Sequence, residues 1–533
     1  MTETKDSIQE TIQDNSSYDE VVYDQLPHKQ GNLRLLETIG DLYGVEPADI
    51  YHCRVLEIGT ATGKTIIPQA EEFPESQFLG IDLSPVQIDV GKELLRSLNL
   101  RNIELRAANI MDVDESWGEF DYIIAHGIYS WVPPVVQEKM LDILQTNLSP
   151  HGLAMYSYNT YPGWRFKEVS RELMLFHARQ AHEFDPKTEI QEARAVIDFT
   201  TEFAAGRKDY FANFFASTQD HLKKVTDHYL AHEHLEVYNA PCYFSEFCRR
   251  LQEKNLRYVA DCDWTTHYKL KRNEKLLQLF KKEQDDETLE QYCDFLTNRT
   301  FRSSVICRRD INVQLRESDI LNRYHFFMPA DCTIKSVKAD EVNEGSPAGW
   351  HFETATCGKI VSSNPLIDLV FEYFINNQEG FFTTNDLWQA VAPQLQDTGD
   401  QNASLSALGT LFSGLVQDGE IRIVLRPPTD RTCDPRRPYV RTFVRQMLKR
   451  NATRLPNTMF ESIGIDAFQA KLMKQFDGRR SITEHVSEVQ KDMLKGRLNV
   501  TYKGAAIRAD DRDRITKSVE EVVQSLRQRR LVF

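Results

Sequence analysis

Short apolar runs alternate with helix-length amphipathic segments between residues 33 and 160. Leu35, Leu36, Ile39 and Leu42 recur at helical spacing, and five short, mostly apolar runs follow them. Apolar runs separated by helical segments are typical of parallel strands that helices cover on both faces. The pattern predicts an α/β fold with a mainly parallel sheet, whose strands are expected at 55–58, 78–81, 103–105, 122–125 and 153–156.

The start of one helix is marked by three residues. Ser84 is a good N-cap, Pro85 suits the first helical position, and Gln87 has the spacing that closes a capping box. We therefore expect a helix to begin directly after the second strand.

The pattern becomes helical after the fifth run. Residues from about 165 to 231 are rich in Phe, His and charged residues, which predicts a helical insertion. A further amphipathic helix and a strand are expected within 243–264, as if to complete the sheet. We assign 18–270 to one domain with this insertion, and 271–325 to a helical regulatory or connecting segment.

The last two hundred residues predict two smaller units. Helices are expected from Pro365, near Thr384–Val391 and near Leu405–Val416, and a strand at Ile421–Val424 follows them. Three helices with a β-wing favour a winged-helix-like unit within an α+β region at 326–430. Residues 431–533 are expected to form a basic, largely helical domain.

Composition narrows the class of protein. The chain has 533 residues, 41% apolar and 27% charged, and no stretch approaches the roughly 18 apolar residues of a membrane span. Residues 1–17 are polar and acidic, so we expect a disordered tail on a cytoplasmic protein. The nine cysteines form no C-x-x-C pair, and His228, His232 and His234 lack an evident third partner, so no metal site is expected.

Charge is distributed unevenly along the chain. Residues 434–533 carry 22 Lys and Arg against 12 Asp and Glu, whereas the whole chain has a net charge of −15. The acidic body favours basic partners over nucleic acid, and 404–419 contains no Lys or Arg to contact phosphates. The basic end is expected to contact an acidic substrate or, slightly favoured, the acidic body of the same chain.

A turn of small residues follows the first strand, Glu57-Ile58-Gly59-Thr60-Ala61-Thr62-Gly63-Lys64-Thr65. A dinucleotide fingerprint needs Gly at 59, 61 and 64, where the chain has Gly, Ala and Lys. A phosphate-binding P-loop needs four residues between Gly and Gly-Lys-Thr, and here there are three. The spacing argues against both NAD and ATP.

Acid-x-Gly-x-x-x-Gly at the first strand, with Asp82 closing the second, resembles the class I S-adenosylmethionine (SAM)-dependent methyltransferases. In that family the glycine loop faces the methionine end of SAM, and the acid accepts hydrogen bonds from the ribose hydroxyls. The resemblance assigns these roles to Gly59, Gly63 and Asp82. Asn109 stands where the family usually has an Asp for the adenine amino group, and Ala61 where it usually has Gly. The alternative is that Asp82 and Asn109 only cap helices or turns.

Two aromatic loops narrow the resemblance. They are His126–Pro134 after the fourth strand and Tyr156–Trp164 after the fifth, and both are expected at the carboxyl edge of the sheet. With them the chain is similar to bacterial methyltransferases that carry a methyltransferase regulatory domain, including the rickettsial-type protein-lysine methyltransferases. Residues 291–302 resemble a recurring segment of that family. The implied fold is a Rossmann-like class I methyltransferase sheet with a helical insertion, plus C-terminal winged-helix-like and helical α+β domains.

The resemblance implies transfer of a methyl group from SAM to lysine side chains of a protein substrate, such as an outer-membrane protein. A small-molecule methyltransferase, a silent scaffold that binds a partner and a homodimer remain open. Aromatic walls attract a sulfonium or a methylammonium. The candidate catalytic residues are Tyr129, Trp131, Tyr158, Asn159, Tyr161 and Trp164. The candidate cofactor-binding residues are Glu57, Gly59, Thr60, Gly63, Asp82, Leu83, Asn109, Ile110 and His126.

Overall fold

The computed structural model describes most of the chain. The described residues are 27–179, 186–236, 238–279, 285–317, 323–330, 332–337, 349–353, 359–360, 364–395, 400–428, 434, 436–502 and 504–533. The expected tail at 1–17 lies outside them.

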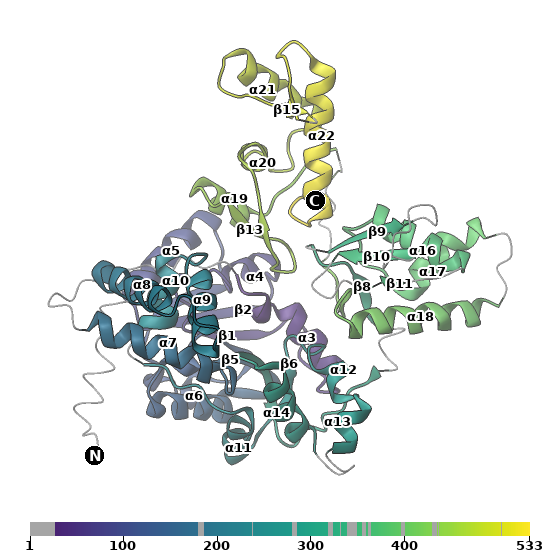
Figure 1. Ribbon diagram of the computed structural model, residues 1–533. Coiled ribbons are helices and arrows are strands. Elements are labelled where there is room, and N and C mark those ends of the chain that lie inside the picture. Colours follow the sequence, from purple (N-terminus) through teal and green to yellow (C-terminus); the bar gives the residue numbers. More distant parts are fainter. Residues whose placement is uncertain are drawn as a thin grey trace, which may run out of the picture.

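A seven-stranded sheet forms the centre of the molecule, with strand order β3-β2-β1-β4-β5-β7-β6 (Figure 1). The five predicted strands are confirmed and are parallel to one another. The strands are β1 (Arg54–Ile58), β2 (Gln77–Asp82), β3 (Ile103–Ala107), β4 (Phe120–Ala125), β5 (Leu148–Asn159), β6 (Leu256–Asp261) and β7 (Phe301–Arg308).

The strand β7 corrects the prediction for 271–325. Helices α12 (Tyr268–Lys271), α13 (Glu274–Leu279) and α14 (Asp286–Thr297) do occupy the first part of this segment. The chain then turns at Asn298, in the left-handed conformation, and β7 enters the sheet antiparallel to both β5 and β6. Residues 301–308 thus belong to the central sheet and are not a helical connection.

Helices pack on both faces of the sheet. One apolar core joins the strands to α3 (Leu33–Leu42), α4 (Ile67–Glu72) and α5 (Pro85–Leu98). The other joins them to α6 (Pro134–Asn147) and α11 (Phe244–Glu253). Between β3 and β4, the expected helix is replaced by two 3₁₀ turns, η2 (Ile110–Asp112) and η3 (Glu115–Trp117). The Asn109 and Asp114 side chains cap these two turns by accepting backbone N–H groups, so the segment forms turns in place of a helix.

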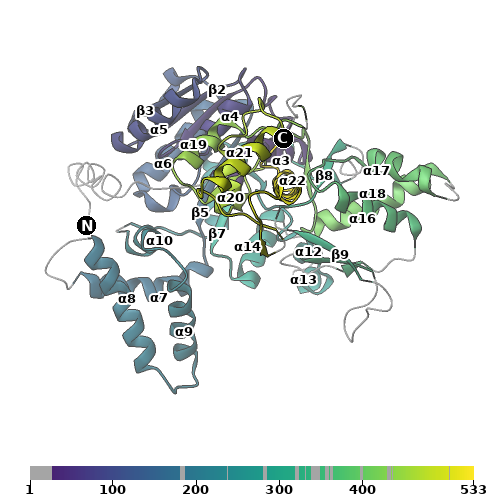
Figure 2. The ribbon, with the colours of Figure 1, turned by 90° about the horizontal axis from the view of Figure 1, so that it is seen from above.

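The helical pattern after Trp164 forms an arm. It consists of α7 (Gly163–Ala178), α8 (Pro186–Phe203), α9 (Tyr210–Leu222), α10 (Asp227–Leu230) and a π-helical turn, η5 (Ala231–Leu235). Seen from above, α8 and α9 project away from the sheet (Figure 2). The arm has its own small apolar core around Met174, Ile197 and Phe215.

Three helices and a strand follow in the middle unit, where the sequence predicts them. They are α16 (Pro365–Asn376), α17 (Thr384–Val391), α18 (Gln401–Gln417) and β12 (Arg422–Val424), and β12 pairs with β8 (His325–Phe327). A second small sheet contains β9 (Thr333–Val337), β10 (Gly349–Glu353) and β11 (Lys359–Ile360).

The C-terminal unit docks on the body of the chain. Its helices are α19 (Thr442–Lys449), α20 (Ala467–Met473), α21 (Ile482–Leu494) and α22 (Arg512–Gln528), and its hairpins are β13 (Arg454–Pro456) with β14 (Ser462–Gly464) and β15 (Thr501–Tyr502) with β16 (Ala505–Ala506). Glu71 of α4 accepts the N–H groups of Thr442 and Phe443 at 2.8 and 3.0 Å, and so caps α19. Glu72 pairs with Arg441 at 2.8 Å. The basic end therefore contacts the acidic body.

In the part of the chain that the structure describes, no helix has the length and apolar character needed to cross a bilayer.

Candidate active site

Three strands bring the expected cofactor residues to one edge. Because β1, β2 and β4 are parallel neighbours, their carboxyl ends place Gly59, Asp82 and His126 at the same edge of the sheet. The loop after β4 lies directly against the glycine turn, since a Cβ atom at Gly59 would collide with the Ile128 side chain.

The glycine turn has an unusual backbone. Gly59, Ala61 and Gly63 all have positive φ angles, of 65°, 48° and 76°. Glycine adopts this conformation freely, whereas alanine there costs on the order of 1 kcal/mol. Ala61, which stands where the resemblance expects glycine, adopts the left-handed conformation that glycine favours. The turn is a cradle in which the backbone can approach a ligand closely, and it fits the expected cofactor.

Asp82 joins this turn to the next helix. Its Oδ2 accepts the Ala61 N–H at 2.7 Å, and its Oδ1 accepts the Ser84 N–H at 3.0 Å. Ser84 caps α5, as predicted, by accepting the Gln87 N–H. The predicted capping box does not close, because the buried Gln87 side-chain oxygen has no partner among the described atoms. Asp82 takes the place of Gln87 at the Ser84 amide, and the two amides orient its carboxylate at the turn.

Glu57 lies beneath the turn and is only 5% exposed. Its Oε2 accepts the Thr60 hydroxyl at 2.5 Å. Burial raises the pKa of Glu57 to about 8, with the Thr60 hydrogen bond opposing this shift and the Asp82 charge adding to it. The hydrogen bond between Glu57 and Thr60 holds the turn from below.

Asn109 lies beside Asp82 at the edge of the sheet. The Ala108 N–H donates to the Asp82 carbonyl at 2.9 Å, and the Asn109 Oδ1 accepts the Met111 N–H at 2.9 Å. Asn109 thus caps η2 and also lies at the edge of the sheet where the cofactor is expected. Its position agrees both with a capping role and with a contact to adenine. Leu83 is 39% exposed, and Ile110 is half-buried next to Asn109.

The two aromatic loops lie side by side. The Asn159 N–H donates to Ser130 Oγ at 2.8 Å, and the Gly127 N–H donates to Ser157 Oγ at 2.7 Å. Trp131 meets Trp164 edge to face, with ring centroids 6.1 Å apart. The loops that the sequence places at one edge are therefore joined by two serine hydroxyls, which sequence analysis did not single out.

Four of the six candidate catalytic side chains are buried, each at most 2% exposed. They are Tyr129, Tyr158, Asn159 and Trp164. The Tyr158 hydroxyl bonds to Ser304 Oγ at 3.1 Å, and the Asn159 amide donates to Asn239 at 3.0 Å. The other two, Trp131 and Tyr161, are half-buried and reach the surface of the loops. The Tyr161 hydroxyl donates to Glu168 at 2.6 Å.

His28, which no sequence motif marks as a site residue, lies against His126. The rings of His28 and His126 stack with centroids 3.8 Å apart and planes 15° apart. The ring centroid of Phe301, the first residue of β7, lies 5.9 Å from that of His126. Burial lowers the pKa of His28 to about 4. The pKa of His126 is held well below 6.5 by burial and by the neighbouring His28.

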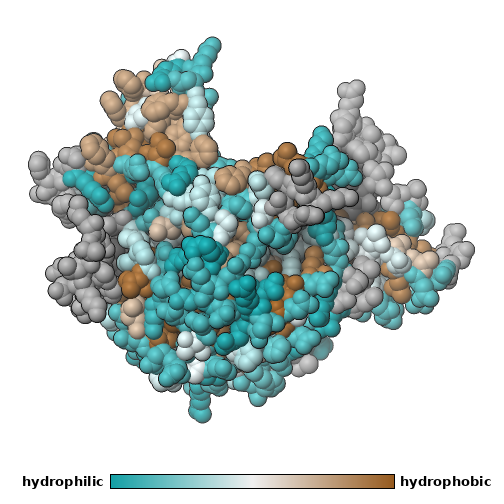
Figure 3. Space-filling view, turned by 90° about the horizontal axis from the view of Figure 1, so that it is seen from below, coloured by the Kyte–Doolittle hydropathy of each residue, from teal (hydrophilic) through white to brown (hydrophobic). Residues whose placement is uncertain are grey.

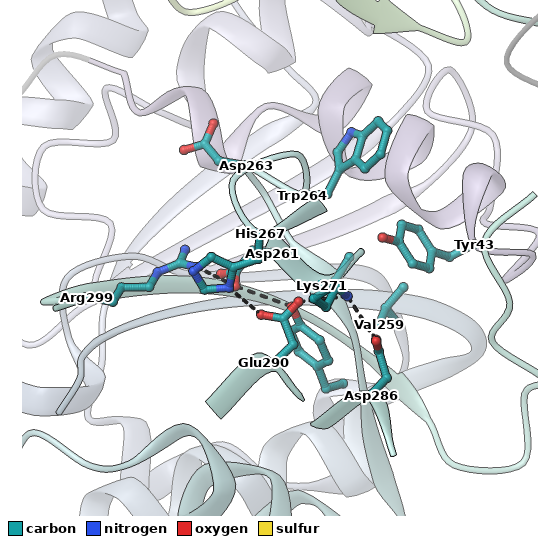
Figure 4. Close-up of a pocket in the computed structure, with 12 residues that line it drawn as sticks. Tyr43, Val259, Asp261, Asp263, Trp264, His267, Lys271, Asp286, Glu290 and Arg299 are labelled. Carbon is teal, nitrogen blue, oxygen red and sulfur yellow. Dashed lines mark hydrogen bonds and ion pairs between the residues drawn. The ribbon is translucent and has the colours of Figure 1, made fainter. Parts of the chain in front are cut away.

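A separate cluster of charges surrounds a narrow cavity at the carboxyl end of β6, with room for about one water molecule (Figure 4). Glu290 pairs with His267 at 2.8 Å and with Lys271 at 2.9 Å. Arg302, fully buried, pairs with Asp261 and Glu290. Burial alone would raise the pKa of Glu290, but His267, Arg302 and Lys271 hold it well below its usual range. Because every charge has an opposite partner, the cluster fastens β6, α14 and β7 together.

Three family models match parts of the chain. "Methyltransferase domain" matches residues 55–152, "Predicted methyltransferase regulatory domain" matches 226–308, and "PKMT, C-terminal winged helix domain" matches 436–531. The first covers the glycine turn and Asp82, the second covers the charge cluster, and the third covers the docked C-terminal unit.

Similar proteins occur in Rickettsia. The uncharacterized protein RP789 of Rickettsia prowazekii is 29% identical over 514 residues, which cover 96% of this chain and 92% of that protein. The uncharacterized protein RP028 of the same species is 37% identical over 243 residues, 46% of this chain and 96% of that protein. The structure of PKMT2 from Rickettsia typhi in complex with AdoHcy matches with 26% identity and a TM-score of 0.83, over 96% of this chain and 99% of that chain.

Proposed function

Because this chain belongs to the SAM-dependent methyltransferases that carry a methyltransferase regulatory domain, we propose that it methylates lysine side chains of a protein. The observation that carries the proposal is similarity to PKMT2 over nearly the whole length of both chains. A shared methyltransferase core alone would suit many acceptors. A match that extends through the arm, the middle unit and the C-terminal winged helix domain favours the same class of acceptor.

The SAM-binding half of the site is assigned to the glycine turn, Asp82 and Asn109. SAM supplies a methyl group on a sulfonium, which transfers in line to a nucleophile. The turn between Gly59 and Gly63 lets the backbone approach the amino-acid end of SAM. Asp82, which two backbone amides orient, offers its carboxylate to the ribose hydroxyls. Charge-assisted hydrogen bonds of this kind contribute about 1.5–3 kcal/mol each.

The acceptor half of the site is assigned to the two aromatic loops. A lysine amine must lose its proton before it attacks, and its ordinary pKa is near 10.4. Walls without charge favour the neutral amine by desolvation. Trp131 and Tyr161 remain partly exposed, and the stacked His28 and His126 rings add no positive charge. The Arg165 guanidinium lies over the Tyr161 ring, 3.8 Å from its centroid, and a like charge also disfavours a protonated lysine. Tyr129, Tyr158 and Trp164 support these walls from the core.

The direct test is methyl labelling. The purified protein is incubated with methyl-labelled SAM and fractions of bacterial protein, including an outer-membrane fraction, and labelled peptides are mapped by mass spectrometry. We expect methylated lysine in protein. The Asp82→Ala variant, run in parallel, controls for label that this chain does not transfer. Label found only in small molecules or nucleic acid would contradict the lysine acceptor.

A variant without the Tyr158 hydroxyl tests whether this group has a structural or a catalytic role. Tyr158→Phe removes its hydrogen bond with Ser304, and we expect the free energy of unfolding to fall by about 1 kcal/mol. Turnover should stay within a few-fold of wild type, because the hydroxyl is buried away from the loop surface. Chemical denaturation and steady-state rates measure both, with Ser304→Ala as the matched variant. A large loss of turnover at unchanged stability would return Tyr158 to the catalytic set.

We also propose that the chain forms a homodimer through its arm. Phe176, Phe199, Phe203 and Tyr210 are each 66–73% exposed, and apolar surface covers much of the projecting arm (Figure 3). The Phe199 and Phe203 rings stack with centroids 6.3 Å apart, and large exposed apolar surfaces often mark an interface. A second copy would present the same aromatic surface and so cover it in a self-complementary way.

The oligomeric state should respond to changes on the arm. We expect a dimer for the wild type by light scattering, and a monomer for the double variant Phe199→Ser and Phe203→Ser. Leu279→Ser on α13 is the matched control, since Leu279 is 73% exposed but lies outside the arm. A wild-type chain that stays monomeric at high concentration would disprove the proposal.

A further inference from the structure

Residues 28–31 form a strap that crosses the carboxyl edge of the sheet. At one end, the Gly31 carbonyl accepts the Gln69 amide of α4 at 3.0 Å. Two residues earlier, the Lys29 side chain pairs with Asp263, just after β6, at 2.9 Å. The strap therefore connects the helix that follows the glycine turn to the far edge of the sheet. His28 belongs to this strap and reaches His126 at the end of β4.

We propose that His28 is a positioning residue for methyl transfer, whose ring stack holds the His126 imidazole in one orientation against the loop that contacts the glycine turn. This inference rests on the proposed function. His126 lies two residues before Ile128, the side chain that packs over Gly59. A ring fixed at this point fixes the distance between the cofactor turn and the acceptor loops. Misplacement by about 1 Å in such a site lowers rates by up to about a hundredfold.

The surroundings of His126 make the stack its main restraint. Phe301 of β7 is tilted at 58° and does not stack on it. The charges on neighbouring elements are engaged elsewhere: Lys29 pairs with Asp263, and the Arg299 side chain donates to the Phe301 carbonyl. His28 is therefore the group that both orients His126 and changes its tendency to bind a proton. The low pKa of both rings agrees with an uncharged stack beside a cationic reaction centre.

Two variants separate the ring from its nitrogen atoms. His28→Ala removes the stack, and His28→Phe keeps a ring of similar size without a titratable group. We expect His28→Ala to lower kcat about tenfold at pH 8, and more at pH 6, while the Kd for SAM changes less than about threefold. His28→Phe should restore kcat to within about threefold of wild type. His52→Ala is the matched control, because the His52 side chain is 65% exposed.

The pKa of His126 can be measured without any methyl acceptor. Nuclear magnetic resonance of histidine-labelled protein follows the His126 pKa, which should rise toward 6.5 in His28→Ala and stay low in His28→Phe. These measurements need no acceptor, so a lysine acceptor that proves wrong leaves them intact. An unchanged His126 pKa in His28→Ala, or a kcat for His28→Ala equal to that of His52→Ala at both pH values, would overturn the positioning role.

Discussion

We expect Asp82→Ala to weaken SAM binding by ten- to a hundredfold. The variant loses a charged acceptor for the ribose hydroxyls, worth about 1.5–3 kcal/mol. It also frees the Ala61 and Ser84 amides that Asp82 holds at 2.7 and 3.0 Å, so the glycine turn loses its orientation. Titration calorimetry measures the affinity directly, and circular dichroism checks the fold.

Asp82→Asn is the informative partner of this variant. Its amide oxygen still accepts one backbone N–H, but the charge is gone, so we expect an affinity between wild type and Asp82→Ala. NADH and ATP should not bind any of the three proteins, because the turn lacks the spacing for either. SAM affinity that is unchanged in a folded Asp82→Ala would remove Asp82 from the site.

We expect Glu72→Gln to destabilise the protein by about 3–5 kcal/mol, the usual effect of breaking a buried ion pair. Glu72 is 9% exposed and pairs with Arg34 and Arg441, both at 2.8 Å. Without its charge, two largely buried guanidinium groups lose their shared partner. Chemical denaturation at pH 7 measures the loss. Glu104→Gln, in the exposed pair with Arg106, is the control and should cost less than about 1 kcal/mol.

The same residue gives the wild type a specific acid sensitivity. Burial alone would raise the pKa of Glu72, but Arg441 and Arg34 outweigh it and lower the pKa to about 2 from the ordinary 4.5. A depressed carboxyl pKa stabilises the fold above pH 4.5, and this stabilisation is lost as the pH falls from 4.5 to about 2. The difference in the free energy of unfolding between wild type and Glu72→Gln should therefore become smaller as the pH falls through this range. A difference in the free energy of unfolding that is equally large at pH 7 and pH 3 would contradict the lowered pKa of Glu72.

The sequence predicts the first five strands and the glycine turn because both depend on local patterns. Apolar runs report burial, and small residues at 59 and 63 report close approach of the backbone. The strand β7 was missed because it follows three helices and runs antiparallel, so its place between β5 and β6 depends on distant partners. The prediction of a helix between β3 and β4 was wrong because the Asn109 and Asp114 side chains cap two 3₁₀ turns in this segment.

The position of part of the site could also be predicted from local patterns. Asp82 and the two loops follow from strand ends that share an edge. Burial of individual aromatic rings could not be predicted, because Tyr158 is covered by Phe247 and Ser304 from remote elements. His28 carried no signal, since its partner His126 lies on another element and only the fold brings the rings together.

Arg34 has consequences for the order in which the protein can be completed during synthesis. This side chain is 1% exposed, and its guanidinium donates to Glu72, Tyr51 and the carbonyls of Arg426 and Pro427. The last two partners lie 392 and 393 positions further along the chain. On a ribosome that adds residues one by one, α3 is made early, but its arginine waits for most of the polypeptide before these acceptors emerge. Contacts of such sequence separation form slowly, and a nascent chain that ends before residue 427 leaves donors of Arg34 to water or to a chaperone.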